Sequence, residues 1–87
     1  MYKSIIKNYI KKLNTQDILN FSLKNNINLN ENEVNIILDY IKNDYETIMY
    51  GNPEHIFNEL KLKLNKDTYD KLIILYNEFK EKYKNYL

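Results

Sequence analysis

Apolar residues recur at intervals of three and four along most of the chain, which is the spacing of one face of an α-helix. The first stripe predicts a helix over about Tyr2 to Lys12. A second helix starts at a cap formed by Asn14 or Thr15 and ends at Asn25-Asn26, because such side chains accept hydrogen bonds from a first helical turn. The predicted inward-facing residues are Tyr2, Ile5, Ile6, Tyr9, Ile10 and Leu13 in the first helix, and Ile18, Leu19 and Ser22 or Leu23 in the second.

The segment Ile27-Asn28-Leu29 alternates like a short extended link that places two side chains in the core. Asn30, followed by Glu31 and Glu33, then starts a third helix, which we expect to be the central one. Residues 44–51 continue this helix or pack as a loop, and the sequence leaves both open. The apolar stripe of the third helix consists of Val34, Ile37, Leu38 and Ile41, widened by Ile36 and Tyr40.

Asn52-Pro53-Glu54 is a clear start for a fourth helix, with a cap, a proline in the first turn and an acidic residue near the helix dipole. The alternation from Leu60 to Leu64 also fits a strand, but no partner strand is evident, so we interpret it as helix. Asn65 or Asp67 opens a fifth helix. The inner faces of these two helices are predicted to hold Ile56, Phe57, Leu60 and Leu64, then Tyr69, Leu72, Ile73, Tyr76, Phe79 and Tyr83.

Two stretches echo each other: residues 15–20 resemble residues 53–58, and Ile36-Ile37-Leu38 recurs as Ile73-Ile74-Leu75. Each half then consists of a helix, a short link and a longer helix. We predict an all-α fold, a compact bundle of about five helices in which two pseudo-repeated helical hairpins follow an N-terminal helix. The 87 residues are expected to form a single helical domain over 1–87.

The run from Leu13 to Ile41 resembles a family of short helical proteins of unknown function from low-GC Gram-positive bacteria. That resemblance implies the helical fold and no activity, because the family has no assigned catalytic residues. The matching positions are Leu13, Asp17, Ile18, Leu19, Ile27, Leu29, Glu33, Ile37 and Ile41. The helix–extended link–helix pattern also resembles small nucleic-acid-binding modules.

The chain offers little catalytic or metal-binding chemistry. It has no Cys, its one His is His55 in the first turn of the fourth helix, and Ser4 and Ser22 have no base beside them in a known motif. We therefore expect no enzyme activity, no catalytic residues, no cofactor and no metal. Lysines are scattered through the N-terminal stretch and the chain has no long apolar run, so we expect neither a signal peptide nor a membrane span. The expected location is therefore the cytoplasm.

All thirteen basic residues are Lys, none is Arg, and Ala is absent. This bias indicates a low-GC genome of a bacterium or phage, so abundant Lys, Asn and Tyr carry little functional information by themselves. The charge is nevertheless segregated: residues 1–28 hold five Lys and one Asp, residues 29–60 one Lys and seven acids, and residues 61–87 seven Lys and four acids. A candidate basic face on the first helix consists of Lys3, Lys7, Lys11 and Lys12.

The simplest interpretation of that basic face is a solvated helix surface, and the alternatives are phosphate or membrane-surface binding. Without Arg, bidentate base recognition is unavailable, which disfavours sequence-specific DNA binding. A second candidate surface, typical of an interface or of a loop that covers the core, contains Tyr45, Met49 and Tyr50.

By elimination, we predict a non-catalytic module that binds an unidentified protein partner, with nonspecific nucleic-acid binding through Lys-rich helix faces as the alternative. A phage-encoded inhibitor that binds a host protein is expected to have the same sequence features. Excess apolar residues on the last two helices, Ile74 and Leu75 among them, also predict a homodimer, unless the fifth helix buries them within one copy. These residues are Leu62, Ile74, Leu75, Tyr83, Tyr86 and Leu87.

Overall fold

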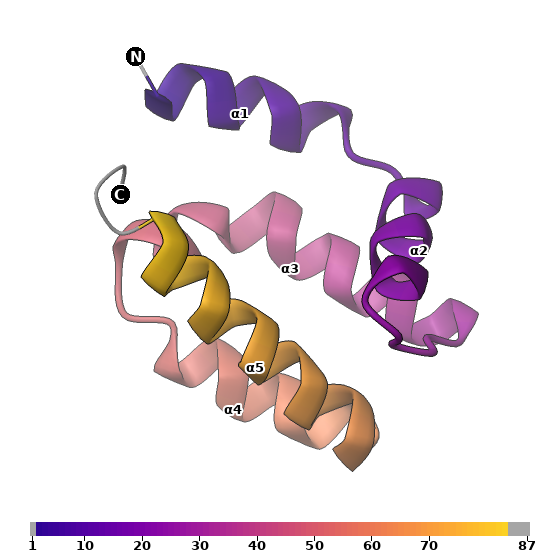
Figure 1. Ribbon diagram of the computed structural model, residues 1–87. Coiled ribbons are helices and arrows are strands. Elements are labelled where there is room, and N and C mark those ends of the chain that lie inside the picture. The colour runs from indigo at the N-terminus through magenta and orange to yellow at the C-terminus, as the bar shows by residue number, and fades with distance from the viewer. Residues whose placement is uncertain (1, 84–87) are drawn as a thin grey trace. The chain divides into compact units, whose positions relative to one another are not determined.

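The computed structural model describes residues 2–83, in which the chain forms five helices and no strand (Figure 1). The helices are α1 (Tyr2–Lys12), α2 (Thr15–Lys24), α3 (Glu31–Tyr50), α4 (Glu54–Lys63) and α5 (Lys66–Tyr83). The predicted all-α class is confirmed. The alternating segment from Leu60 to Leu64 forms the end and C-cap of α4 and not a strand.

Asparagine side chains cap the starts of three helices. The side-chain oxygens of Asn14, Asn30 and Asn65 each accept a hydrogen bond from the backbone N–H three residues later, at 3.0, 2.8 and 2.9 Å. The start of a helix leaves four backbone N–H groups without intrahelical partners. Each of these side chains accepts a hydrogen bond from one such N–H group. The cap positions therefore determine where α2, α3 and α5 begin.

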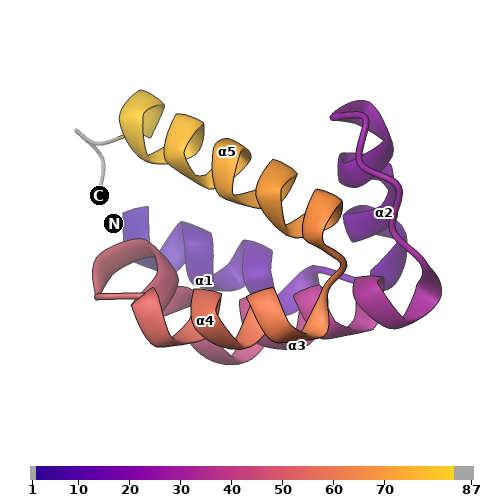
Figure 2. The ribbon, with the colours of Figure 1, turned by 90° about the horizontal axis from the view of Figure 1, so that it is seen from below.

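The chain divides into two compact units, the first formed by Met1–Tyr45 and the second by Glu46–Leu87. In the first unit, α1 runs antiparallel beside α3, and α2 crosses the beginning of α3 at a steep angle (Figures 1 and 2). Its buried apolar side chains are Leu13, Ile18, Ile27, Val34 and Ile37.

In the second unit, α4 and α5 form an antiparallel hairpin (Figure 1). Ile56, Leu60 and Leu64 are its buried apolar side chains. The Tyr76 hydroxyl donates a hydrogen bond to the Ile48 carbonyl oxygen at 3.1 Å, which joins α5 to the last turns of α3.

The connection from α2 to α3 begins with a tight turn at the C-terminus of α2. Asn26 adopts a left-handed backbone conformation with φ of 60°. The N–H of Ile27 donates to the Ser22 carbonyl at 2.8 Å and that of Asn26 to the Leu23 carbonyl at 3.2 Å, which is the Schellman pattern. Ile27 is consequently directed inward and is only 1% exposed, as predicted for the link, whereas Leu29, the second side chain predicted to enter the core, is half-buried.

Residues 44–50, left open by the sequence, are helical and complete α3. The helix is interrupted at Asp44, whose φ of −127° and ψ of 16° are non-helical. Gly51 then ends it, with its N–H donating to the Thr47 carbonyl at 3.1 Å. A Cβ atom on Gly51 would lie 3.3 Å from the Thr47 Cα, so the chain turns here by a close backbone approach.

Several residues predicted to face inward are exposed, and those predictions are wrong. Ile5 and Tyr9 are 60% and 65% exposed, because α1 faces inward with the other side of its stripe, where Ile6 and Ile10 are half-buried. Phe79 is also exposed, and Leu38 is only half-buried. Of the alternatives Ser22 and Leu23, Ser22 is the buried one. The side chains of Tyr2, Tyr83, Tyr86 and Leu87 lie outside the described residues. Within residues 2–83, none of the helices combines the length and apolar character needed to cross a membrane.

Candidate functional site

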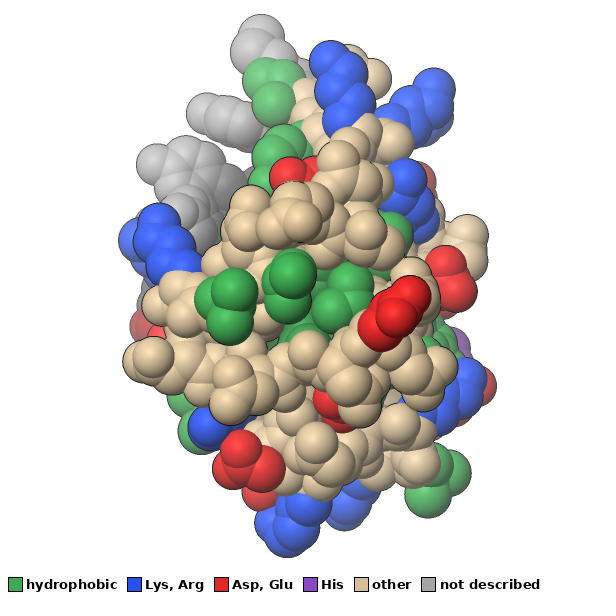
Figure 3. All heavy atoms as spheres, turned by 90° about the vertical axis from the view of Figure 1, so that its right-hand side faces the viewer, with side chains coloured by type: hydrophobic (Ala, Val, Ile, Leu, Met, Phe, Trp, Pro, Cys, Tyr) green, Lys and Arg blue, Asp and Glu red, His purple; other side chains and the backbone are tan. Residues whose placement is uncertain are grey.

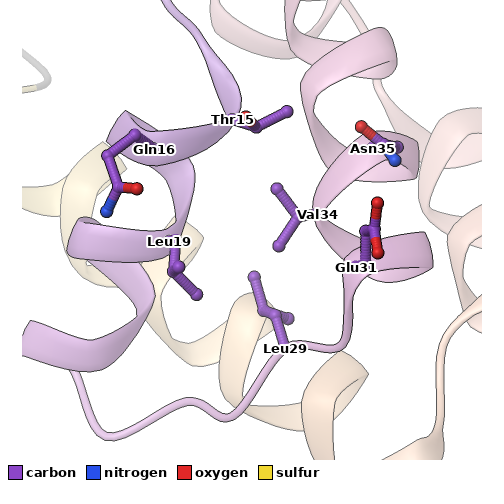
Figure 4. Close-up of a pocket in the computed structure, with 7 residues that line it drawn as sticks. All are labelled: Thr15, Gln16, Leu19, Leu29, Glu31, Val34 and Asn35. Atoms are coloured by element: carbon purple, nitrogen blue, oxygen red, sulfur yellow. The ribbon is translucent and has the colours of Figure 1, made fainter.

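An apolar pocket in the first unit, here named the α2–α3 pocket, lies between the first turns of two helices. Leu19, Leu29 and Val34 point toward one another at its centre (Figure 4). Val34 is buried, whereas Leu19 and Leu29 are half-buried and are reached from solvent. The pocket is lined by Thr15, Gln16, Leu19, Leu29, Glu31, Val34 and Asn35.

The three apolar side chains meet because the caps and the link fix their positions. The Asn14 cap starts α2 so that Leu19 lies in its second turn, and the Asn30 cap starts α3 so that Val34 follows one turn later. The link after Asn26 delivers Leu29 between them. Figure 3 shows hydrophobic side chains gathered at the centre of one face, over α2 and the beginning of α3.

Leu23 extends the apolar surface of this pocket along α2. It follows Leu19 by four residues, which places the two on the same side of the helix. Its side chain is 56% exposed. The α2–α3 pocket and Leu23 together therefore present neighbouring apolar side chains to water.

One carboxylate lines the pocket, and two more lie at the starts of the helices that form it. Asp17 accepts the Asn14 N–H at 3.0 Å, and Glu33 accepts the Asn30 N–H at 3.2 Å, so each helix start carries a reciprocal capping box. These two acids offset the positive ends of α2 and α3, and Glu31 is the acidic residue that lines the pocket itself. None of the described residues that line the pocket is a lysine, so the pocket suits an apolar group accompanied by a positive charge.

The size of the pocket is informative about what it binds. Its volume is about 280 Å³, at the lower edge of the roughly 300–1,000 Å³ typical of small-molecule sites. Among the described residues that line it, Glu31 is the only titratable one, and a single exposed carboxylate does not form an acid–base pair. The arrangement therefore suits the side chains of a protein partner better than a substrate undergoing chemistry.

The predicted basic face lies on α1, and Lys3, Lys7, Lys11 and Lys12 are all exposed. Lys7 and Lys11 line a second pocket of about 230 Å³, together with Ile10, Lys42 and Tyr45, which we name the lysine pocket. The Lys42 ammonium donates to the Lys11 carbonyl oxygen at 3.4 Å, at the negative end of α1. Sequence reasoning missed Lys42, whose only signal was being the one Lys among seven acids.

The predicted interface residues do not form one exposed surface. Tyr45, Met49, Tyr50 and Leu75 are half-buried, and Tyr45 belongs to the first unit. Ile74 is 57% exposed on α5, flanked one turn away by Asp70 and Glu78. Asp70 is paired with Lys66 at 2.8 Å, and this hydrogen bond and charge raise the pKa of Lys66.

A groove between α4 and α5 has an aromatic floor. The Phe57 and Tyr76 rings pack edge to face, with their centroids 4.7 Å apart. The groove that they line has a volume of about 430 Å³. Asn58 and Asn77 lie on its rim with Glu54 as the one acidic lining residue. Nothing in this groove selects one class of occupant.

Candidate catalytic residues are dispersed. His55 is exposed in the first turn of α4, and the buried Ser22 hydroxyl donates to the Leu19 carbonyl at 2.8 Å. In the described part of the chain, no three His, Cys, Asp or Glu side chains lie close enough together to hold a metal ion. Comparison of the chain with protein-family models, curated proteins and solved structures found no match. The assignment of function therefore depends on the physical chemistry of these surfaces.

Proposed function

We propose that this protein is a non-catalytic helical module that binds another protein through the α2–α3 pocket, and that it works in the cytoplasm. The observation that supports this is the convergence of Leu19, Leu29 and Val34 in a solvent-accessible pocket, continued by the exposed Leu23. Apolar surface left in contact with water next to charged residues is typical of protein interaction sites.

The proposal is tested by placing a photo-crosslinking amino acid at Thr15, on the rim of the pocket, and irradiating a nuclease-treated native lysate. The matched control carries the same amino acid at Lys24, which is exposed at the other end of α2. We expect a discrete protein adduct from position 15 that is lost with Leu19→Glu and absent from position 24. Equal labelling from both positions, or no adduct from position 15, would contradict the proposal.

A second function, nonspecific nucleic-acid binding, is favoured by one observation: Lys7, Lys11 and Lys42 line the same pocket from two helices. Lysines that contact phosphates release counterions, so such binding falls steeply with salt concentration. Replacing all three by Gln is then expected to reduce the salt slope of oligonucleotide affinity by about 2–3. Fluorescence anisotropy at several salt concentrations measures that slope. An unchanged slope would show that these lysines do not contact phosphates.

A further inference from the structure

The exposed side of α1 carries two large apolar side chains that its own unit does not cover. Ile5 and Tyr9 are one helical turn apart and are 60% and 65% exposed. Lys12 follows Tyr9 by three residues and Ile5 by seven, which places it on the same side of the helix. This side of α1, here named the Ile5–Tyr9 face, is apolar with a positive charge at its C-terminal end.

The α2–α3 pocket has the complementary character. Its centre is apolar, its rim holds Glu31, and Asp17 and Glu33 lie at the adjoining helix starts. Helix α1 contains four Lys and no acidic residue. An apolar helix face with a lysine therefore matches the pocket in both polarity and sign of charge.

We propose that the occupant of the α2–α3 pocket is the Ile5–Tyr9 face of a second copy of this chain. The inference depends on the proposed function, because it names the partner that the pocket binds. Both surfaces belong to the unit Met1–Tyr45, so each copy offers one of each. A two-fold dimer forms the same contact twice, with Tyr9 of each copy entering the pocket of the other.

The surface on α5 is a weaker candidate for self-association. Ile74 is an exposed apolar side chain with acidic residues one turn away on each side, and one of them, Asp70, is already paired with Lys66 within the same copy. The α1 contact combines two apolar side chains, a pocket to receive them and opposite charges. The dimer contact predicted from the sequence at Ile74 and Leu75 is therefore replaced by one on α1, and Ile74 becomes the control position.

The first test is sedimentation equilibrium of the full chain from about 1 µM to about 500 µM. We expect a reversible monomer–dimer equilibrium, with a dissociation constant raised about 100-fold by Tyr9→Glu and unchanged by Ile74→Glu, because only the first places a charge in the apolar contact. Circular dichroism checks that each variant is folded, and Ile5→Glu provides a second variant on the same face. A monomer at all concentrations, or a dimer sensitive to Ile74→Glu and not to Tyr9→Glu, overturns the inference.

A charge exchange tests the pairing itself. Lys12→Glu and Glu31→Lys are each expected to weaken self-association, since like charges then meet in both contacts of the dimer. In a mixture of the two variants, one contact pairs the reversed charges and the other keeps the native pair, so a heterodimer is expected to re-form. Failure of the folded variants to associate on mixing overturns the assignment of this contact.

The outcome is distinguishable from failure of the proposed function. A crosslinked adduct of twice the chain mass from position 15 supports the second copy as the partner. A monomeric protein that still gives a position-15 adduct with a different protein removes the inference and retains the protein-binding function. A monomer without any adduct removes both.

Discussion

At the scale of single residues, asparagine has more structural roles than composition suggests. Asn14, Asn30 and Asn65 cap helices, and Asn26 terminates one. Asn tolerates the left-handed region and has a side chain short enough to reach the first helical turn. The positions of these residues, and not their number, carry the structural information.

Asn26 is expected to tolerate replacement by Gly better than replacement by Ala. Its φ of 60° is strained for an ordinary L-residue, so Asn26→Ala should lower the free energy of unfolding by about 1 kcal/mol relative to Asn26→Gly. Urea unfolding followed by far-UV circular dichroism measures the difference. Equal stability of the Ala and Gly variants would show that the αL cap does not constrain the link to Ile27.

The cap at Asn30 is expected to matter more than the one at Asn14. Glu33, its reciprocal partner, is only 4% exposed, whereas Asp17 is exposed, and an unsatisfied buried group is costlier than an exposed one. Asn30→Ala should therefore cost about 1–2 kcal/mol of unfolding free energy and Asn14→Ala about 0.5–1 kcal/mol. The control Asn30→Ser, which retains a capping oxygen, should stay within about 0.5 kcal/mol of the native protein. The reverse order of the two Ala variants would contradict this.

At the scale of helices, the sequence predicts the boundaries well and the burial less well. The helix starts were predictable because Asn and the acids after it mark them locally, as at Asn30 and Glu33. Burial of Ile5 and Tyr9 was predicted wrongly because the apolar stripe of α1 is wider than the surface that covers it. Burial depends on neighbouring helices, which residue spacing does not specify.

The α2–α3 pocket could not be predicted for the same reason. Leu19, Leu29 and Val34 all have the spacing of core residues, and their sequence signal is identical to that of a closed core. Val34 is buried as expected, whereas Leu19 and Leu29 are half-buried where α2 crosses the beginning of α3 at a steep angle (Figure 1). The basic face on α1 was visible because lysines at intervals of four need no tertiary contact to share a side, whereas Lys42 comes from another helix.

Helix α4 provides a direct test of the helical interpretation of residues 60–64. Leu60 is 8% exposed and Leu62 is 88% exposed. Leu60→Ala should lower the unfolding free energy by about 2–5 kcal/mol, while Leu62→Lys should change it by less than about 0.5 kcal/mol. In a strand, Leu60, Leu62 and Leu64 would share one face, and Leu62→Lys would then be as damaging as Leu60→Ala in the same urea titration.

At the scale of the whole molecule, charge is distributed so that each unit is close to neutral while its parts are not. Met1–Tyr45 holds six Lys and five acids, and Glu46–Leu87 holds seven of each. Within the first unit the positive charge is concentrated on α1 and the negative charge on α3 and at the start of α2. A near-neutral unit with opposite charges on separate elements has little net repulsion between copies, which is compatible with the self-association inferred above.

The two units are too small for independent stability to be expected. They span residues 1–45 and 46–87, close to the length of about 40 residues below which a chain usually needs disulfides, a metal or a partner to fold, and the protein has no Cys. The boundary between them also falls within α3 (Glu31–Tyr50), just after its interruption at Asp44. We therefore expect residues 1–87 to unfold in a single cooperative transition, as the prediction of a single domain requires.

Hydrogen exchange of an Ile37→Ala variant tests this cooperativity. Ile37 lies in the core of the first unit and is 8% exposed, so its truncation should cost about 2–5 kcal/mol. If unfolding is cooperative, the most protected amides of α4 and α5 lose the same amount of protection as those of α1 to α3, because they exchange through the same global opening. Leu62→Lys, an exposed change in the second unit, serves as the control and should leave all protection factors unaltered. Protection lost only within residues 2–45 would show that the units unfold separately, and the chain would then comprise two domains joined through α3.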